Sequence, residues 1–215
     1  MRRRKPGPLR VSPSGHRGAE AQARVQRIVA AASRLFVTRG YHRTSLDAIL
    51  RRSGGSKATL RKYFGNKAGL LGVVLTDEAA RCVARADRAA EHRSVAGALR
   101  AFARVVLEFY CRRDSLLVYR AVIAETAAQP EVGRRFHHGG HMTFVTALAK
   151  HLTRWQERGA LLLIDAAADA DRFLQLLRAG PHDQALLGVV ERVPRAAVHR
   201  HVDACVRIFL NGLKP

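Results

Sequence analysis

The chain has 215 residues and a formal net charge of +21, and 47% of its residues are hydrophobic. That apolar fraction is enough for a packed core and excludes a wholly disordered chain. No apolar run reaches the ~18 residues of a membrane span, and the Arg-rich start lacks the apolar stretch of a secretory signal. The three cysteines are odd in number and far apart, which excludes a disulfide framework. We therefore expect a cytoplasmic globular protein.

The basic charge is concentrated near the N-terminus. Residues 1–67 contain 17 Lys and Arg against Glu20 and Asp47, a net of +15, whereas residues 68–215 have a net of +6. This asymmetry indicates a polyanionic partner for the first third of the chain, although an Arg-rich protein could carry an ordinary basic surface. Residues 1–18 combine three prolines and three glycines with no acid, which predicts a flexible basic tail. Within it, Arg2–Lys5 are expected to contact phosphates or the minor groove, unless the tail only aids solubility or is not translated.

Helical signals begin after this tail. Apolar residues at helical spacing predict a first helix over about residues 20–40. The pattern Thr44-x-x-Asp47 resembles a capping box and predicts a short second helix that Gly54-Gly55 ends. Ser56 is expected to cap a third helix of similar length. Two short helices joined by a glycine turn are typical of a helix-turn-helix.

The rest of the chain also favours helices, and no strand or hairpin turn is evident. Further helices are predicted from about Lys67, over 95–111 and 114–127, from Pro130 to Gly159 with a kink at Gly139-Gly140, from Asp165 to Gly180-Pro181, and from Pro194. The predicted fold class is all-α. A tail (1–18) precedes a three-helix DNA-binding domain (19–66) and a C-terminal helical bundle (67–215) for ligand binding and dimerisation.

The third helix has the composition of a DNA-recognition helix. It is expected to expose Lys57, Thr59, Arg61 and Lys62. Arg and Lys can donate to guanine O6 and N7 in the major groove, and Thr and Tyr hydroxyls can hold phosphates. The alternative is an ordinary helical hairpin with a solvated basic face.

Residues 28–71, IVAAASRLFVTRGYHRTSLDAILRRSGGSKATLRKYFGNKAGLL, resemble the DNA-binding domain of TetR-family regulators. The segments YRAVIAETAAQPEVGRRF (119–136) and HVDACVRIFLNGL (201–213) are similar to repressors of the AcrR/AefR-like group. The resemblance implies a dimeric repressor that binds a palindromic operator and is released by a small-molecule effector. A transcriptional activator of the same family, or an architectural DNA-binding protein without an effector, is the alternative.

The resemblance also implies individual DNA contacts. Thr44 and Tyr63 match phosphate contacts, Ser56 and Lys57 match the start of the recognition helix, Thr59 matches a base or phosphate contact, and Lys67 matches a backbone contact. Three positions depart from the family pattern. Gly55 replaces an apolar residue, Ala58 replaces a frequent glycine, and Arg61 replaces a tyrosine, so the details of base readout differ from the family pattern.

In the C-terminal half, one apolar stripe has the spacing that helix pairing needs. It comprises Val198, Val202, Cys205, Phe209 and Leu213, and we expect it to form the dimer interface. The alternative is burial of this stripe within the monomer. The ligand pocket is expected to be lined by Phe102, Phe109, Tyr110, Tyr119, Phe144, Leu148 and Phe173, any of which could instead be plain core. The absence of a clear buried charge predicts a mostly apolar effector.

Other kinds of site are not expected. The chain has no phosphate-binding glycine loop after a strand, no nucleophile elbow and no HExxH motif, so we expect neither an enzyme nor a cofactor. His137, His138 and His141 lack a further ligand to complete a metal site, and we interpret them as an exposed polar turn. An oxidant-sensing cysteine is less expected than buried, unreactive thiols.

Overall fold

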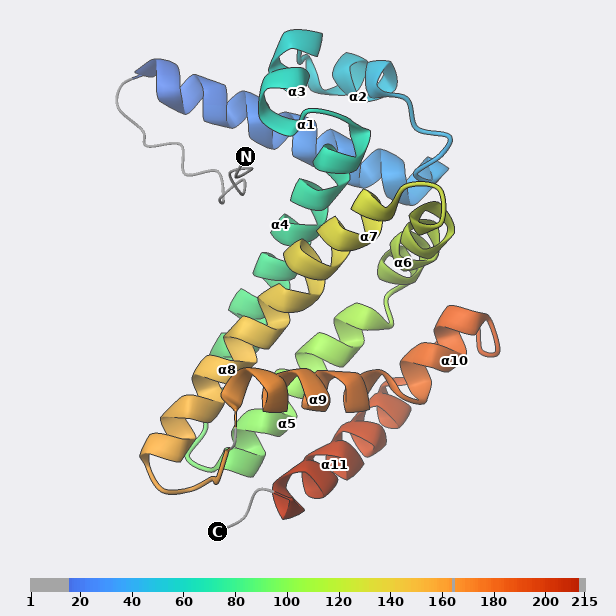
Figure 1. Ribbon diagram of the computed structural model, residues 1–215. Helices are drawn as coiled ribbons and strands as arrows, with labels where there is room; N and C mark the ends of the chain where they lie inside the picture. The colour runs from blue at the N-terminus through green and yellow to red at the C-terminus, as the bar shows by residue number, and fades with distance from the viewer. Residues whose placement is uncertain (1–15, 164, 213–215) are drawn as a thin grey trace, which may run out of the picture.

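The computed structural model describes residues 16–163 and 165–212, with side chains from residue 19 onward. No β-strand occurs in these residues, so the predicted all-α fold is confirmed (Figure 1). The proposed DNA contacts of Arg2–Lys5, and Leu213 of the predicted dimer stripe, lie outside the described residues. No helix among the described residues is both long enough and apolar enough to cross a bilayer.

Three helices form a compact head at one end of the molecule (Figure 1). They are α1 (His16–Arg39), α2 (Leu46–Ser53) and α3 (Lys57–Phe64). Helix α1 includes the last three residues of the predicted tail, 16–18. The core of the head is made of side chains that recur at helical spacing on each helix, namely Ile28, Ala32, Leu35, Phe36, Ile49, Leu50, Leu60 and Phe64. Burial of this shared apolar face holds the two short helices, which would be marginal in isolation.

The start of α2 differs from the prediction. Ser45, not Thr44, is the N-cap, and its hydroxyl accepts a hydrogen bond from the Ala48 amide at 3.1 Å. Thr44 is fully buried, and its hydroxyl lies within hydrogen-bonding distance of the carbonyls of Leu35 (3.1 Å) and Gly40 (2.7 Å). The predicted capping box at Thr44 is therefore wrong, and Ser45 is a simple N-cap, because Ala48 three residues later has no side chain that could return a hydrogen bond. Adjacent Thr and Ser both satisfy the cap pattern, and burial decides between them.

Helix α4 (Lys67–Ala89) connects the head to the rest of the molecule. Its first turns pack Leu70, Leu71 and Val74 into the core of the head. Its later turns pack Ala79, Cys82 and Ala86 into the core of the bundle. The two cores are therefore joined along one continuous helix.

The remaining helices pack with the later turns of α4 to form the bundle. They are α5 (Val95–Tyr110), α6 (Arg113–Thr126), α8 (Met142–Glu157), α9 (Ala166–Arg178), the short α10 (Pro181–Leu187) and α11 (Arg195–Asn211). As predicted, Asp165 caps α9 by accepting from the amides of Ala167 and Ala168. The largest side chains with almost no exposure in this core are Phe102, Phe144, Phe173, Leu148, Leu152 and Leu177.

A long rod of α7 (Pro130–Phe136), a π-helical turn (His137–His141) and α8 packs beside α4 (Figure 1). The predicted irregularity at Gly139-Gly140 takes the form of this π-turn. A Cβ added at Gly139 would overlap the Thr76 hydroxyl of α4, so glycine allows the two helices to approach closely. The prediction of an exposed polar turn is wrong for His141, because its side chain is buried and contacts Asp171.

The apolar stripe on α11 also differs from the prediction. Val198, Val202 and Cys205 are buried within the bundle of the same chain, and Phe209 packs against Phe173 with ring centroids 4.8 Å apart. Val198, Val202 and Cys205 therefore belong to the monomer core, and the partly buried Phe209 packs against that core. The stripe packs against α5 and α9 of the same chain.

The bundle core should be sensitive to truncation. Leu148→Ala removes a fully buried side chain and is expected to lower the free energy of unfolding by about 2–5 kcal/mol. The matched control is Leu162→Ala, because Leu162 is 59% exposed and its loss should change stability by no more than about 0.5 kcal/mol. Urea denaturation followed by circular dichroism measures both. Equal effects of the two substitutions would contradict this packing.

Candidate DNA-binding surface and ligand cavity

The recognition helix α3 is fixed at both ends by local hydrogen bonds. Ser56 caps its start, as predicted, by accepting from the Thr59 amide at 3.1 Å. Gly54 ends α2 with a φ of 67°, a left-handed conformation that glycine adopts without strain. The turn between the helices is therefore set by residues 54–56. This geometry leaves the polar face of α3 on the outside of the head.

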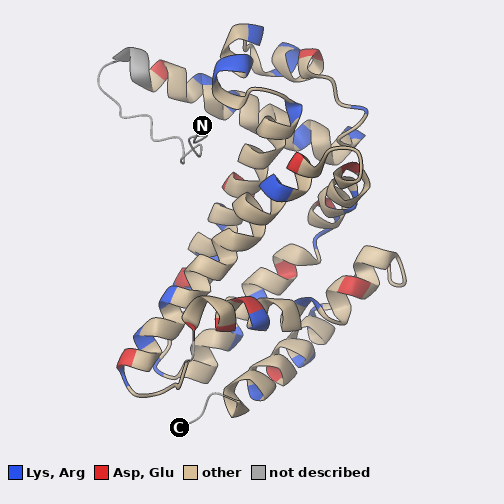
Figure 2. Ribbon diagram, in the orientation of Figure 1, with Lys and Arg blue, Asp and Glu red and all other residues tan. Residues whose placement is uncertain are grey.

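That outer face is basic. Lys57, Arg61 and Lys62 are exposed on α3, and further arginines are exposed on α1, on α2 and between them (Figure 2). The described head contains only two acids, and one of them, Asp47, lies 3.1 Å from the Lys57 ammonium. Both partners are largely exposed, so this ion pair contributes at most about 1 kcal/mol and would exchange readily for a phosphate.

The structure separates the predicted DNA-contact residues into two groups. Ser56, Lys57, Arg61 and Lys62 are exposed, and Thr59 and Tyr63 are half-buried on the same helix. The Lys62 ammonium lies 5.4 Å from the centre of the Tyr63 ring. Thr44 does not join them, because a phosphate contact would require its buried hydroxyl to abandon the carbonyls of the α1–α2 connection. The phosphate contact of Thr44 therefore stays a prediction.

Lys67 has a second set of contacts inside the protein. Its ammonium donates to the His42 carbonyl at 3.2 Å and lies 4.3 Å from the centre of the Tyr41 ring. Burial lowers the pKa of Lys67, and the negative charge of Glu125 partly offsets that effect. Lys67 thus holds the α1–α2 connection against the start of α4, a role that the sequence did not reveal.

The packing around Gly55 explains one departure from the family pattern. A Cβ at this position would lie 2.9 Å from the Cδ1 atom of Ile28 and 3.2 Å from a Leu50 methyl. The side chain of Ile28 therefore fills the space that an apolar residue at position 55 would occupy. The apolar side chain that packs against this turn is therefore supplied by α1 and not by the turn itself.

Polar contacts connect the head to the bundle. Glu125 of α6 is only 2% exposed, and its carboxylate contacts the imidazole of His42 in the head and accepts from the Gln129 amide at 3.0 Å. On α1, the Ser33 hydroxyl donates to Glu78 of α4 at 3.3 Å. The head is therefore attached to both α6 and α4, and movement of either helix would change its position.

A cavity of about 120 Å³ lies between the head and the bundle. Its walls come from α1 (Phe36, Val37), α4 (Val74, Leu75), α5 (Phe109, Tyr110), α6 (Val118, Tyr119), the α7–α8 rod (Phe136, Gly140, Phe144) and residues of α9 and α10. Four predicted lining residues, Phe109, Tyr110, Tyr119 and Phe144, are among them. The other three, Phe102, Leu148 and Phe173, are absent from the lining and are buried in the core.

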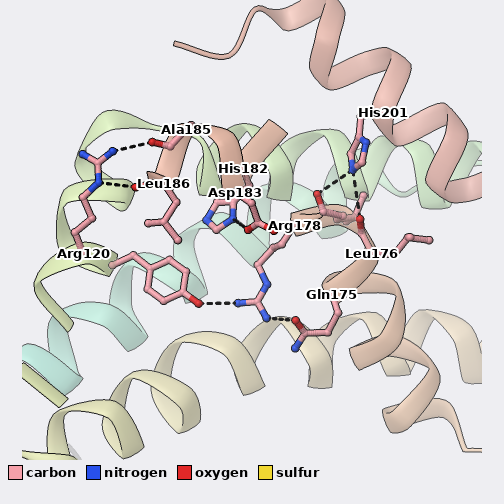
Figure 3. Close-up of polar contacts among 11 residues, drawn as sticks. Arg120, Gln175, Leu176, Arg178, His182, Asp183, Ala185, Leu186 and His201 are labelled. Carbon is pink, nitrogen blue, oxygen red and sulfur yellow. Dashed lines mark hydrogen bonds and ion pairs between the residues drawn. The ribbon is translucent and has the colours of Figure 1, made fainter. Parts of the chain in front are cut away.

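Four basic residues at the same cavity were missed. They are Arg112 before α6, His141 of the π-turn, Arg178 at the end of α9, and His182 of α10. Arg120 of α6 donates to the carbonyls of Ala185 and Leu186 at 2.7 and 2.8 Å and thereby holds α10 in place (Figure 3). The residues stand far apart in sequence, and no local pattern distinguishes them from surface positions.

The cysteines and possible metal ligands do not form a further reactive site among the described residues. Burial raises the pKa of Cys111 to about 12 and that of Cys205 to about 11, so neither thiol forms the thiolate that an oxidant sensor needs at neutral pH. Within the described part of the chain, no three His, Cys, Asp or Glu side chains are placed to hold a metal ion.

The sequence matches two family descriptions. Residues 28–74 match the bacterial regulatory proteins of the tetR family, and residues 97–212 match the C-terminal domain of AefR-like transcriptional repressors. No curated protein matches the chain in sequence.

Solved structures share the fold over nearly the whole chain. A TetR-family transcriptional regulator from Mesorhizobium loti is 25% identical, with a TM-score of 0.78 over 91% of this chain and 98% of its own. The flavonoid-responsive regulator FrrA is 27% identical, with a TM-score of 0.70 over 90% of this chain and 98% of its own. A TetR transcriptional regulator from Agrobacterium tumefaciens is 22% identical, with a TM-score of 0.70 over 88% of this chain and 94% of its own. This similarity concerns the fold only.

The junction of α3 and α4 yields a prediction about the recognition helix. A Cβ at Gly69 would overlap the Phe64 carbonyl oxygen, which is backbone and cannot turn aside. Gly69→Ala is therefore expected to lower the free energy of unfolding by about 3 kcal/mol, at the upper part of the range for overpacking. Gly140→Ala is the control, because its nearest neighbour would be a Phe136 ring carbon at 4.0 Å. Thermal denaturation that ranks the two variants equally would contradict the predicted overlap.

Proposed function

The chain belongs to the TetR family of bacterial regulatory proteins, and we propose that it is a dimeric repressor that leaves its operator when an effector fills the cavity. The broader assignment is that of a DNA-binding transcription regulator and not an enzyme. The finer assignment depends on where the cavity lies. Its walls include α1 of the head as well as α4 and α6 of the bundle, so an occupant would touch the DNA-binding domain directly.

The proposed mechanism is a shift between two head positions. Two heads can enter successive major grooves when their recognition helices are about 34–36 Å apart. A ligand that prefers a wider cavity displaces α1 and α4, and with them α3. DNA affinity then falls by the ratio of the ligand affinities for the two states. The contact between Glu125 and His42 transmits the same movement from α6.

Two similarities support the repressor assignment and the response to an effector. The C-terminal match, residues 97–212, is to a domain described as that of AefR-like transcriptional repressors. FrrA, which shares the fold at 27% identity, is described as responsive to a flavonoid. For this chain, we propose an effector that binds in the cavity between head and bundle.

We assign the dimer interface to the outward face of α11. Ala197, Ala204 and Ile208 recur there at helical spacing, and Ile208 is 57% exposed. Small side chains at two of these positions would allow a second helix to approach closely. This face replaces the predicted stripe, whose described members lie in the monomer core or pack against it.

Selection from random duplexes tests the function as a whole. The purified chain is expected to enrich one inverted repeat, and a promoter carrying that repeat should be silenced when the protein is expressed. Enrichment of no discrete sequence would favour an architectural role instead. Stimulation of the promoter would make the protein an activator.

Arg61 is expected to read a base. Its planar fork of donors matches guanine O6 and N7, and it is exposed one turn after Lys57 on α3. Arg61→Ala should weaken binding to the selected site by about 1–3 kcal/mol and relax the preference at one base pair in each half-site.

Arg154→Ala is the control for Arg61, because Arg154 is exposed at the far end of α8. Repeating the selection with both variants distinguishes base readout from phosphate contact. If Arg61→Ala retains every base preference and merely lowers the salt slope by about one, Arg61 contacts phosphate and the assignment fails.

Ile208 is expected to stabilise the dimer. Ile208→Glu places a charge in the proposed interface and should shift the protein towards monomer in sedimentation equilibrium. Ile123→Glu is the matched control, since Ile123 is 54% exposed on α6, away from α11. Equal dimer dissociation constants for the two variants would move the interface elsewhere.

A further inference from the structure

One end of the cavity is polar, although most of its wall is apolar; Ser33, Glu78, Arg112, Asp114 and Ser115 also belong to the lining. Arg178, Tyr110, His141 and His182 reach this end from four different elements. Figure 3 shows Arg178 beside His182, with Gln175 on the same helix. A mostly apolar effector, as the sequence predicted, would leave these groups facing a partner that cannot hydrogen-bond to them.

Arg178 has neutral partners only. It donates to the Tyr119 hydroxyl at 3.4 Å and to the side-chain oxygen of Gln175. No carboxylate among the described residues lies within ion-pair distance of its guanidinium. Asp171, the nearest acid on α9, instead contacts His141 at 2.6 Å. An arginine without a carboxylate partner at the edge of an apolar cavity is suited to bind an anion.

Two further polar atoms at this end lack partners. The Tyr110 hydroxyl and His141 Nδ1 are both buried and make no hydrogen bond to the described residues. Such unsatisfied groups are uncommon in native proteins and call for a ligand or a water. Burial also lowers the pKa values of His141 and His182, so both rings are mainly neutral at pH 7.5. Arg178 then supplies the positive charge.

The walls next to this end are aromatic. The Tyr119 ring stacks on Phe136 with centroids 4.9 Å apart and planes 19° apart, and it stacks on His182 at 5.7 Å and 27°. Phe144 lies within 5.7 Å of Phe109 and 5.3 Å of Tyr110, measured between centroids. Flat surfaces of this kind favour a planar occupant. The volume of about 120 Å³ corresponds to one ring, since cavities of roughly 150 Å³ accept benzene.

We propose that the effector is a single-ring aromatic carboxylic acid of the benzoate class. Its carboxylate accepts hydrogen bonds from the Arg178 guanidinium and the Tyr110 hydroxyl. Its ring lies among Tyr119, Phe136 and Phe144. This inference rests on the proposed function only in taking the occupant of the cavity as the effector. It differs from the flavonoid response of FrrA in requiring one ring and a full negative charge.

Calorimetric titration of the purified full-length chain at pH 7.5 tests the proposal without DNA. The probes are 4-hydroxybenzoate, its neutral analogue 4-hydroxybenzamide, and the non-aromatic acid cyclohexanecarboxylate. We expect the aromatic acid to bind about tenfold more tightly than either of the others, because charge-assisted hydrogen bonds and ring stacking each add affinity. Equal affinity for acid and amide, or no binding of the aromatic acid, overturns the proposal.

Variants assign the roles of individual side chains. Arg178→Gln should abolish the difference between acid and amide, whereas Arg178→Lys, which retains the charge, should preserve part of it. Tyr110→Phe should weaken acid binding with little loss of stability, because its hydroxyl has no partner to lose. Arg88→Gln, an exposed position on α4, is the control and should bind like the parent protein. An unchanged preference for the acid in Arg178→Gln rules out the proposed anion contact.

A separate measurement keeps this proposal distinct from the proposed function. Binding of the ligand-free chain to its selected duplex tests the regulator, and release of that duplex by 4-hydroxybenzoate tests the link. Tight DNA binding without any binding of the acid refutes the effector class and leaves the regulator standing. Binding of the acid with no effect on DNA affinity refutes the proposed mechanism but not the anion site.

Discussion

The arrangement of the molecule depends on α4, a single helix that is shared by two hydrophobic cores. Its 23 residues span about 35 Å, and its apolar face is divided between the head and the bundle. A helix of this kind bends little without breaking hydrogen bonds, so a displacement at its middle moves its N-terminal end. The recognition helix α3 is joined to that end through Gly65 and Asn66. The position of the DNA-reading surface is thereby set by contacts far along the chain.

The cavity occupies the place where this constraint is most easily disturbed. It lies beside the middle of α4, at Val74 and Leu75, and touches α1 across from it. The polar contacts of Glu125 with His42 and of Ser33 with Glu78 enclose the same junction. An occupant of the cavity would therefore contact the head and the bundle at the same time.

The sequence predicted the helices well, because caps and glycine stops are local signals; Ser56, Asp165 and the glycines at 40, 54 and 159 act as expected. It could not assign partners to apolar faces. The α11 stripe has the same spacing whether it meets its own bundle or a second chain. Likewise Phe102 and Phe109 stand on one helix, yet only the latter lines the cavity. Arg178 and His182 could not be assigned to the cavity from the sequence, because no spacing in the chain links them to Tyr110. They reach it only in the folded bundle.

The π-turn at His137–His141 determines which side chains of the α7–α8 rod meet the cavity. Phe136 and Phe144 are eight residues apart, and in an uninterrupted α-helix they would diverge by about 80°. The extra residue of the π-turn rotates the side chains of α8 back by roughly 100° about the helix axis. The rings of Phe136 and Phe144 therefore lie on the same side of the rod. The π-turn therefore shifts the helical phase of α8 relative to α7 by one residue. In related chains, gain or loss of a single residue at this turn would exchange the entire set of α8 side chains offered to a ligand, a route by which effector choice could change in one evolutionary step.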